Sequence, residues 1–312
     1  MTGQGQQDPS IEHIPVLADD LSKLISLPTD GQMVDATVGH GGHSFLFGKQ
    51  LGPDGLILGL DVDKNCINRA QKRLGDLKCK VVLVRENFSK LTEVLDANGI
   101  DKVDFILADF GFCSGQLTDV TKGLSFQENM PLDMRLDSRI KKTAADVVNK
   151  QSQEALADLI YEYGEERASR RIARFIVQHR QSQPITTTAQ LAAIVCRALN
   201  QPVRGRRPQK THPATKTFQA LRIAVNNEMS VIDDFLAAAP AVIKENGHLA
   251  VISFHSLEDR KVKLNFKENA AKGFYEILTK KPIKPSRDEI IANPRARSSK
   301  LRVARRLSVT VE

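Results

Sequence analysis

The sequence predicts an α/β fold, a doubly wound parallel sheet with an inserted helical domain. Short apolar runs of strand type alternate with helical patterns over the first third of the chain, and one further apolar run follows much later. Strand alternating with helix is typical of a parallel sheet, because each parallel connection needs a crossover. Five strands are expected, at 33–36, 56–60, 80–84, 103–108 and 248–253.

The rhythm of strand and helix breaks between residues 108 and 248. Helical patterns cover 143–163, 164–179 and 189–199, and no strand pattern interrupts them. We therefore predict a sheet domain made of 1–116 and 212–312, with 117–211 inserted as a helical domain that recognises the substrate. Residues 216–244 are expected to return as a single helix that covers the sheet. Its core stripe would contain Phe218, Leu221, Val225, Met229 and Ile232.

Composition favours a globular cytoplasmic protein. The 312 residues are 41% hydrophobic and 26% charged, and no apolar run approaches the roughly 18 residues of a membrane helix. Residues 1–11 are polar and lack the basic and apolar regions of a targeting peptide, so we expect no membrane partner. The four cysteines show no metal-ligand spacing, which favours reduced thiols and predicts no metal.

Positive charge is concentrated near the end of the chain. The formal net charge is +8, whereas residues 259–312 alone contain 15 Lys and Arg against 6 Asp and Glu. A charge run is usually a solvated face, but two more basic clusters occur in this chain. One has helical spacing and the other lies in a loop that contains Pro and Gly. Their members are Arg167, Arg170, Arg171 and Arg174 in the first, and Arg204, Arg206, Arg207 and Lys210 in the second. Together the clusters favour a partner with a phosphate backbone.

A glycine-rich turn follows the first predicted strand. Gly39, Gly41 and Gly42 come just after Asp35, and Asp61 ends the second apolar run about 20 residues later. Glycine lets the backbone approach a ligand closely, and a carboxylate at that distance can accept hydrogen bonds from two ribose hydroxyls. The spacing is not G-x-G-x-x-G, so the pattern favours the acidic turn of S-adenosylmethionine (SAM) methyltransferases over a dinucleotide-binding loop.

Chemically distinctive residues follow the other strands, where ligands of open α/β sheets bind. Asp109 ends a very apolar run, and because an unpaired carboxylate is costly there, it is expected to have a hydrogen-bonding task. Each of the others has two readings. Asp61 is a ribose ligand or a helix cap, Phe88 stacks on a purine or belongs to the core, and His255 is a proton acceptor or a structural histidine.

Four longer stretches, at 131–135, 163–167, 212–223 and 253–260, are specific enough to name a family. With them the chain resembles the ribosomal small-subunit RNA cytosine-N4 methyltransferases, the RsmH or MraW family, nearly from end to end. The stretch 109–116 departs from the family pattern, reading DFGFCSGQ where the family usually has DLGVSSPQ, yet Asp109, Gly111, Ser114 and Gln116 are kept.

The resemblance implies a Rossmann-like class I SAM-dependent methyltransferase whose substrate is cytosine 1402 in the decoding region of 16S ribosomal RNA, within the small ribosomal subunit. The SAM contacts carried over from the family are Gly41, Gly42, His43, Asp61, Phe88, Asp109 and Gln116. The candidates for accepting the proton of the amine are Asp109 and then His255, with Phe110 or Phe112 available to stack on an unpaired base. The basic residues expected to contact RNA are Arg170, Arg174, Arg206, Arg207, Arg295 and Arg297.

Two other functions stay open at this point. A non-catalytic ribosome assembly factor could retain SAM as a structural ligand, although intact Asp61, Asp109 and Gln116 favour catalysis. A DNA amino-methyltransferase is weaker, since the usual Asn/Asp-Pro-Pro-Tyr/Phe motif is absent after Asp109. The sequence leaves a homodimer open.

Overall fold

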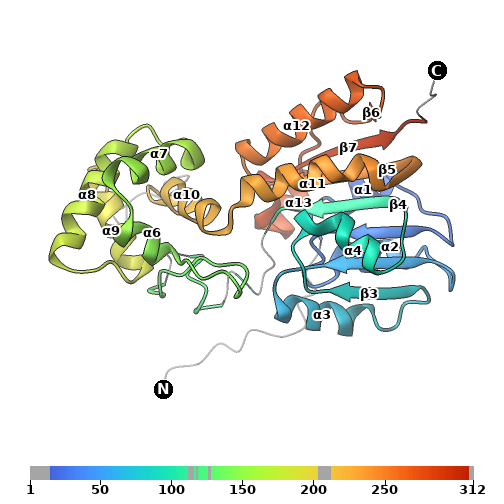
Figure 1. Ribbon diagram of the computed structural model, residues 1–312, viewed down its shortest axis with the longest axis horizontal. Helices are drawn as coiled ribbons and strands as arrows, with labels where there is room; N and C mark the ends of the chain where they lie inside the picture. The colour runs from blue at the N-terminus through green and yellow to red at the C-terminus, as the bar shows by residue number, and fades with distance from the viewer. Residues whose placement is uncertain (1–14, 112–115, 117–118, 126–127, 203–211, 309–312) are drawn as a thin grey trace. The chain divides into compact units, whose positions relative to one another are not determined.

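The computed structural model describes residues 15–111, 116, 119–125, 128–202 and 212–308. They form two compact units (Figure 1). The sheet unit comprises 1–86, 91–111 and 238–312, and the helical unit comprises 87–90 and 112–237. No helix among the described residues is both long and apolar enough to cross a membrane.

The sheet unit contains one seven-stranded sheet in the order β3-β2-β1-β4-β5-β7-β6. The first five strands are parallel, and β7 runs antiparallel to both of its neighbours. The strand order reverses between β1 and β4, as in a doubly wound α/β fold, so the predicted fold class is confirmed. The strands are β1 (Gln32–Asp35), β2 (Leu56–Leu60), β3 (Lys80–Val84), β4 (Val103–Asp109), β5 (Ile243–Ser253), β6 (Tyr275–Ile277) and β7 (Lys300–Arg306).

Both faces of the central strands are buried, as their apolar sequences require. On one face Met33, Ile57 and Phe105 pack with Leu21 and Phe47, and the rings of Phe47 and Phe105 meet edge to face at 4.9 Å. The helices of this unit are α1 (Ala18–Leu24), α2 (Gly42–Gly48), α3 (Lys64–Leu74), α4 (Leu91–Ala97), α12 (Ser256–Ala271), α13 (Arg287–Ala292) and the short η2 (Pro294–Ser298).

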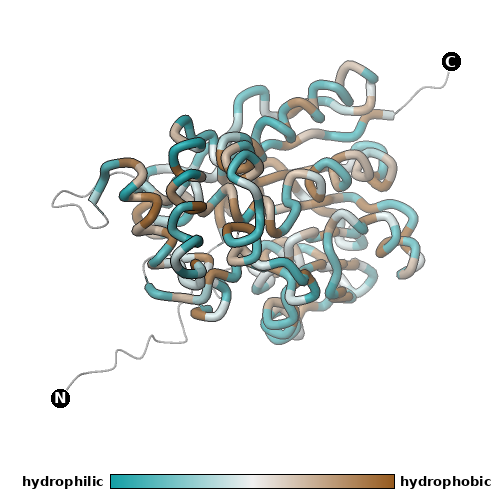
Figure 2. Tube along the Cα trace, turned by 60° about the vertical axis from the view of Figure 1, so that its left-hand side comes forward, coloured by the Kyte–Doolittle hydropathy of each residue, from teal (hydrophilic) through white to brown (hydrophobic). Residues whose placement is uncertain are grey.

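The helical unit has its own core of buried aliphatic side chains. Its helices are α6 (Ala144–Lys150), α7 (Gln153–Gly164), α8 (Ser169–Ser182), α9 (Thr188–Ala198) and α10 (Thr215–Asn226), and it also holds the short η1 (Phe88–Lys90). Hydrophobic and hydrophilic colours alternate along these helices in Figure 2, as expected of amphipathic helices. The third predicted helix, 189–199, is confirmed by α9, whose N-terminus is a capping box between Thr187 and Gln190.

Two predicted helices are wrong because each is broken in the structure. Residues 143–163 form α6 and α7, since the Ser152 hydroxyl caps a new helix by accepting a hydrogen bond from the backbone of Ala155. Residues 216–244 form α10, then α11 (Glu228–Val242), then the start of β5. Asn227, at φ 51°, ends α10 in the left-handed conformation.

Because the helix breaks at Asn227, the apolar residues predicted to cover the sheet do not all pack against it. Phe218, Leu221 and Val225 lie in the core of the helical unit and not on the sheet. Ile232 is buried in α11, where it follows the break. The 3.6-residue period was therefore read correctly, but a period does not reveal that a helix ends and restarts in the same phase.

The strands β6 and β7 were not predicted, because β6 has only three residues and because basic residues interrupt the apolar pattern of β7. In β7, Leu301 and Val303 are buried in the core. Arg302, which lies between them in sequence, donates from Nε to Asp259 Oδ1 at 2.7 Å, and its side chain is 8% exposed. Lys300 pairs with the same carboxylate at 3.2 Å. Part of the predicted basic surface is therefore neutralised inside the fold.

Candidate active site

The glycine-rich turn lies at the carboxyl end of β1, beside the position where the strand order reverses. Gly39 has φ 51° and Gly41 has φ 77°, a left-handed conformation that residues with a Cβ rarely adopt. A Cβ on Gly41 would also lie 3.2 Å from the Leu74 side chain. The turn therefore needs glycine to bring the backbone from β1 into α2, which begins at Gly42.

Asp61 is held rigidly at the end of β2. Its Oδ2 accepts a hydrogen bond from the backbone of Gly39 at 3.1 Å, and its Oδ1 accepts one from the backbone of Asp63 at 2.8 Å. The N-cap of α3 is Asp63, so the alternative of Asp61 as that cap is ruled out. A carboxylate offers about four lone-pair positions, so it can accept more hydrogen bonds than these two.

Asp35 stabilises the glycine-rich turn by accepting hydrogen bonds from Ser44 and from the backbone of Thr37. Ser44 donates its hydroxyl proton to Asp35 Oδ2 at 2.6 Å, and the backbone of Thr37 donates to Oδ1 at 3.2 Å. Burial raises the pKa of the Asp35 carboxyl, and the hydrogen bond from Ser44 partly opposes that rise. The contact of Ser44 with Asp35 was not predicted from the sequence. The only signal for this contact was a hydroxyl residue nine positions after the acidic residue that ends β1.

Asp109 ends β4 in the same unit. Its backbone N–H donates to Thr37 Oγ1 at 2.7 Å, and its Oδ1 accepts from the backbone of Gly111 at 3.2 Å. Burial raises the pKa of its carboxyl from 3.8 to about 7, the bond from Gly111 lowers it, and the charge of Glu258 raises it further. The predicted hydrogen-bonding task of this carboxylate agrees with these contacts.

His43 lies next to Asp109. Its Nε2 is 2.9 Å from the carbonyl oxygen of Val16, and its Nδ1 is 4.0 Å from Asp109 Oδ2. Burial lowers the pKa of the imidazole, which favours the neutral ring. The structure thus brings His43, Asp61 and Asp109 together with the glycine turn at one edge of the sheet.

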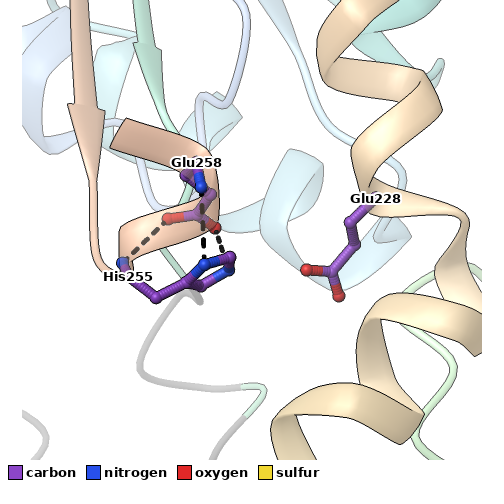
Figure 3. A group of neighbouring side chains, drawn as sticks. All are labelled: Glu228, His255 and Glu258. Carbon is purple, nitrogen blue, oxygen red and sulfur yellow. Dashed lines mark hydrogen bonds and ion pairs between the residues drawn. The ribbon is translucent and has the colours of Figure 1, made fainter. Parts of the chain in front are cut away.

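His255 has a capping role at the start of α12. Its Nδ1 is 3.5 Å from the backbone nitrogen of Glu258, and its Nε2 is 2.9 Å from Glu258 Oε1 (Figure 3). Glu258 Oε2 in turn accepts from the backbone of Phe254 at 2.7 Å and of His255 at 3.2 Å, which completes a capping box. Glu228, also drawn in Figure 3, belongs to the helical unit and is paired with Arg222 there. The geometry gives His255 a structural role, and its role as a proton acceptor stays a prediction.

Phe88 and Gln116, the remaining predicted cofactor contacts, belong to the helical unit. Phe88 starts η1, and its ring meets that of Phe235 edge to face at 5.4 Å. Gln116 is a buried polar residue. Of the two candidate stacking residues, Phe110 is half-buried at the end of β4, and Phe112 lies outside the described residues.

The predicted RNA-binding arginines fall into three groups. Arg170 and Arg174 are exposed on α8, whose opposite face buries Ile172 and Ile176. Arg295 and Arg297 are exposed in η2 of the sheet unit. Arg206 and Arg207 lie outside the described residues. The amphipathic reading of α8 is confirmed, whereas the RNA contacts stay predictions.

Comparison with known proteins gives one consistent result. The chain is 47% identical over 300 residues to the ribosomal RNA small subunit methyltransferase H of Cyanothece sp., which covers 96% of each chain. It is 46% identical over 296 residues to the same enzyme of Thermosipho africanus, covering 95% of this chain and 98% of that one. The match with Acidobacterium capsulatum is 44% over 299 residues, covering 94% and 97%. The model of the MraW methylase family matches residues 10–307, and the chain belongs to that family.

Proposed function

We propose that this protein transfers a methyl group to the exocyclic N4 of a cytosine, cytosine 1402, in the decoding region of 16S ribosomal RNA. The observation that carries the proposal is the Asp109 carboxyl, placed at the end of β4 beside the glycine turn with its pKa raised to about 7. A group with such a pKa ionises near neutral pH, where it can accept the proton of an amine.

S-adenosylmethionine is the methyl donor of the family, and it supplies a methyl carried on a positively charged sulfur. The donor set at the sheet edge fits it. Asp61 accepts hydrogen bonds from two backbone N–H groups at the end of β2, the strand end at which a carboxylate of this kind of fold accepts from ribose hydroxyls. We assign Gly41, Gly42, His43 and Asp109 of the sheet unit to SAM binding, and Phe88, as the adenine contact, and Gln116 of the helical unit remain proposed SAM contacts.

The low nucleophilicity of the substrate nitrogen determines what the protein must supply, which is positioning and a proton acceptor. The lone pair of cytosine N4 is delocalised into the ring, so the nitrogen is a weak nucleophile. Holding it in line with the methyl group contributes up to roughly 7 to 11 kcal/mol to lowering the barrier. Asp109 accepts a hydrogen bond from the amine as positive charge develops, and then takes the proton. His255 is the weaker candidate for this step, because both of its ring nitrogens lie against Glu258.

A labelled-transfer experiment tests the reaction. Small ribosomal subunits that lack the modification are incubated with the protein and methyl-labelled SAM, and the RNA is digested to nucleosides. Label in N4-methylcytidine is the expected result. Label in 5-methylcytidine or in a ribose-methylated nucleoside would overturn the assignment. Binding of SAM without any transfer would favour the alternative, a non-catalytic assembly factor.

The helical unit is proposed to recognise the RNA. Support comes from α8, which exposes Arg170 and Arg174 one turn apart. If both contact phosphates, replacing them together with alanine should flatten the dependence of RNA affinity on salt by about 1 to 2 units of slope. Arg69 and Lys72, two exposed cations on α3, form the matched control pair. An equal change of slope in both double variants would contradict a specific role for α8.

A further inference from the structure

Two hydrogen-bond acceptors face each other at the candidate active site. The carbonyl oxygen of Val16 carries no proton, so the 2.9 Å contact with His43 Nε2 requires the ring proton to be on Nε2. In the neutral ring Nδ1 then has a lone pair, and it faces Asp109 Oδ2 at 4.0 Å. An ionised carboxylate has no proton to share across this gap. A protonated one has a proton to donate.

The rest of the site leaves Asp109 Oδ2 as the atom directed at His43. The backbone of Asp109 is fixed by Thr37 Oγ1, and Oδ1 already accepts from the backbone of Gly111. On the other side the Val16 carbonyl anchors the imidazole, whose side chain is 8% exposed. Closing the gap requires a rotation about the Asp109 Cβ–Cγ bond, which moves Oδ2 and also Oδ1, the acceptor of the 3.2 Å hydrogen bond from Gly111.

We propose that His43 is a positioning residue that holds the proton taken up by Asp109, by accepting a hydrogen bond from the protonated Oδ2 at Nδ1. The step balances without any other reactant. The proton leaves the substrate amine, the electrons of the N–H bond stay on nitrogen, and a lone pair of Oδ2 forms the new O–H bond. The imidazole neither gains nor loses a proton. Only the source of the proton rests on the proposed function.

The charged groups around the pair allow this arrangement. His43 faces the charges of Asp35 from β1, Arg73 from α3 and Glu289 from α13. Burial is the largest influence and lowers the pKa of His43, Arg73 lowers it further, and the two carboxylates oppose them. Asp109 faces Glu258 from α12, whose charge favours the protonated carboxyl. Burial and the charge of Arg73 therefore favour the neutral form of His43, in which Nδ1 is an acceptor.

The test is a pH titration of the Asp109 carboxyl carbon by NMR, in the protein without cofactor or RNA. The His43→Gln variant keeps a donor near the position of Nε2 for Val16 but lacks the acceptor at Nδ1. It should lower the pKa of Asp109 by about half a unit to one unit, because the protonated form loses a hydrogen bond. The His43→Asn variant places an amide oxygen near the position of Nδ1 and should keep the pKa near its wild-type value. Equal pKa values in wild type and His43→Gln, or equal falls in both variants, would overturn the proposal.

A second measurement needs no substitution at His43. In the wild-type protein, the ¹⁵N resonance of Nδ1 should shift as Asp109 titrates, while the ring stays neutral, and Asp109→Asn should abolish that shift. A proton bound directly to Nδ1 at pH 8, or a resonance that does not move, would refute the arrangement. Neither experiment involves RNA. A failure of the proposed methyl transfer would therefore not affect this inference, and a failure of this inference would not affect the proposed methyl transfer.

Discussion

Replacing Asp109 with asparagine should change how the stability of the protein depends on pH. Burial raises the pKa of this carboxyl from 3.8 to about 7, and its side chain is 21% exposed. Between these two pH values the folded state keeps a proton that the unfolded state has released. The stabilisation from the raised pKa is therefore complete below pH 3.8 and is lost as the pH rises to about 7.

The expected size follows from linkage. Across this window the unfolding free energy falls by about 1.4 kcal/mol for each pH unit, which amounts to about 2 to 3 kcal/mol between pH 5 and pH 8. The Asp109→Asn variant keeps the shape of the side chain and has no such titration. Relative to wild type, it should therefore gain about 2 to 3 kcal/mol between pH 5 and pH 8.

Urea unfolding of both proteins at the two pH values measures this difference, in which the titration of groups common to both proteins largely cancels. Asp101→Asn, which removes an exposed carboxylate just before β4, is measured beside them as the control. A difference between Asp109→Asn and wild type that does not change with pH would refute the raised pKa. The mechanism assigned to Asp109 would then lose its physical basis.

Two further predictions concern the charged residues that were read from the sequence. Asp61→Ala should weaken SAM binding in calorimetry by about 1.5 to 3 kcal/mol for each ribose hydrogen bond lost, whereas Asp63→Asn, which keeps the cap of α3, should bind normally; unchanged affinity in a folded Asp61→Ala protein would remove Asp61 from the site. Arg302→Ala should destabilise the fold by about 1.5 to 3 kcal/mol, because Asp259 would lose the hydrogen bond from buried Arg302 while Lys300 still pairs with it. A loss below about 1 kcal/mol in denaturant unfolding would mean that the pair is no more than a surface ion pair.

The strands of the parallel sheet were predictable because each is marked by a short run of neighbouring apolar residues. The runs at 56–60 and 80–84 match β2 and β3 at both ends, since apolar, β-branched stretches between turn signals have few other uses. The strand ends then located Asp61 and Asp109 without any further information. The break at Asn227 was not predictable in the same way, because a left-handed residue between two helices leaves the hydrophobic period intact.

The interpretation of the basic residues as an exposed surface is correct for α8 and wrong for Arg302 in β7. On α8 the arginines occupy the face opposite Ile172, so periodicity alone separated exposed from buried positions. In β7 the partner of Arg302 is Asp259, 43 residues earlier in the chain. A count of charged residues along the sequence does not reveal an ion pair between residues that are far apart in the chain. The proximity of His43 to Asp109 was hidden for the same reason, since His43 lies in α2 and Asp109 ends β4, far apart in the chain.

The position of the methyl group in the RNA shows most directly whether Asp109 serves methyl transfer to a cytosine N4. Small subunits are treated with SAM and either wild-type protein or Asp109→Asn, and ribonuclease fragments of the 16S RNA are analysed by tandem mass spectrometry. We expect one added methyl on N4 of cytosine 1402 with the wild type, and a sharply lower single-turnover rate with Asp109→Asn at near-normal SAM affinity. A methyl group on another base, or a wild-type rate from the Asp109→Asn protein, would contradict this expectation.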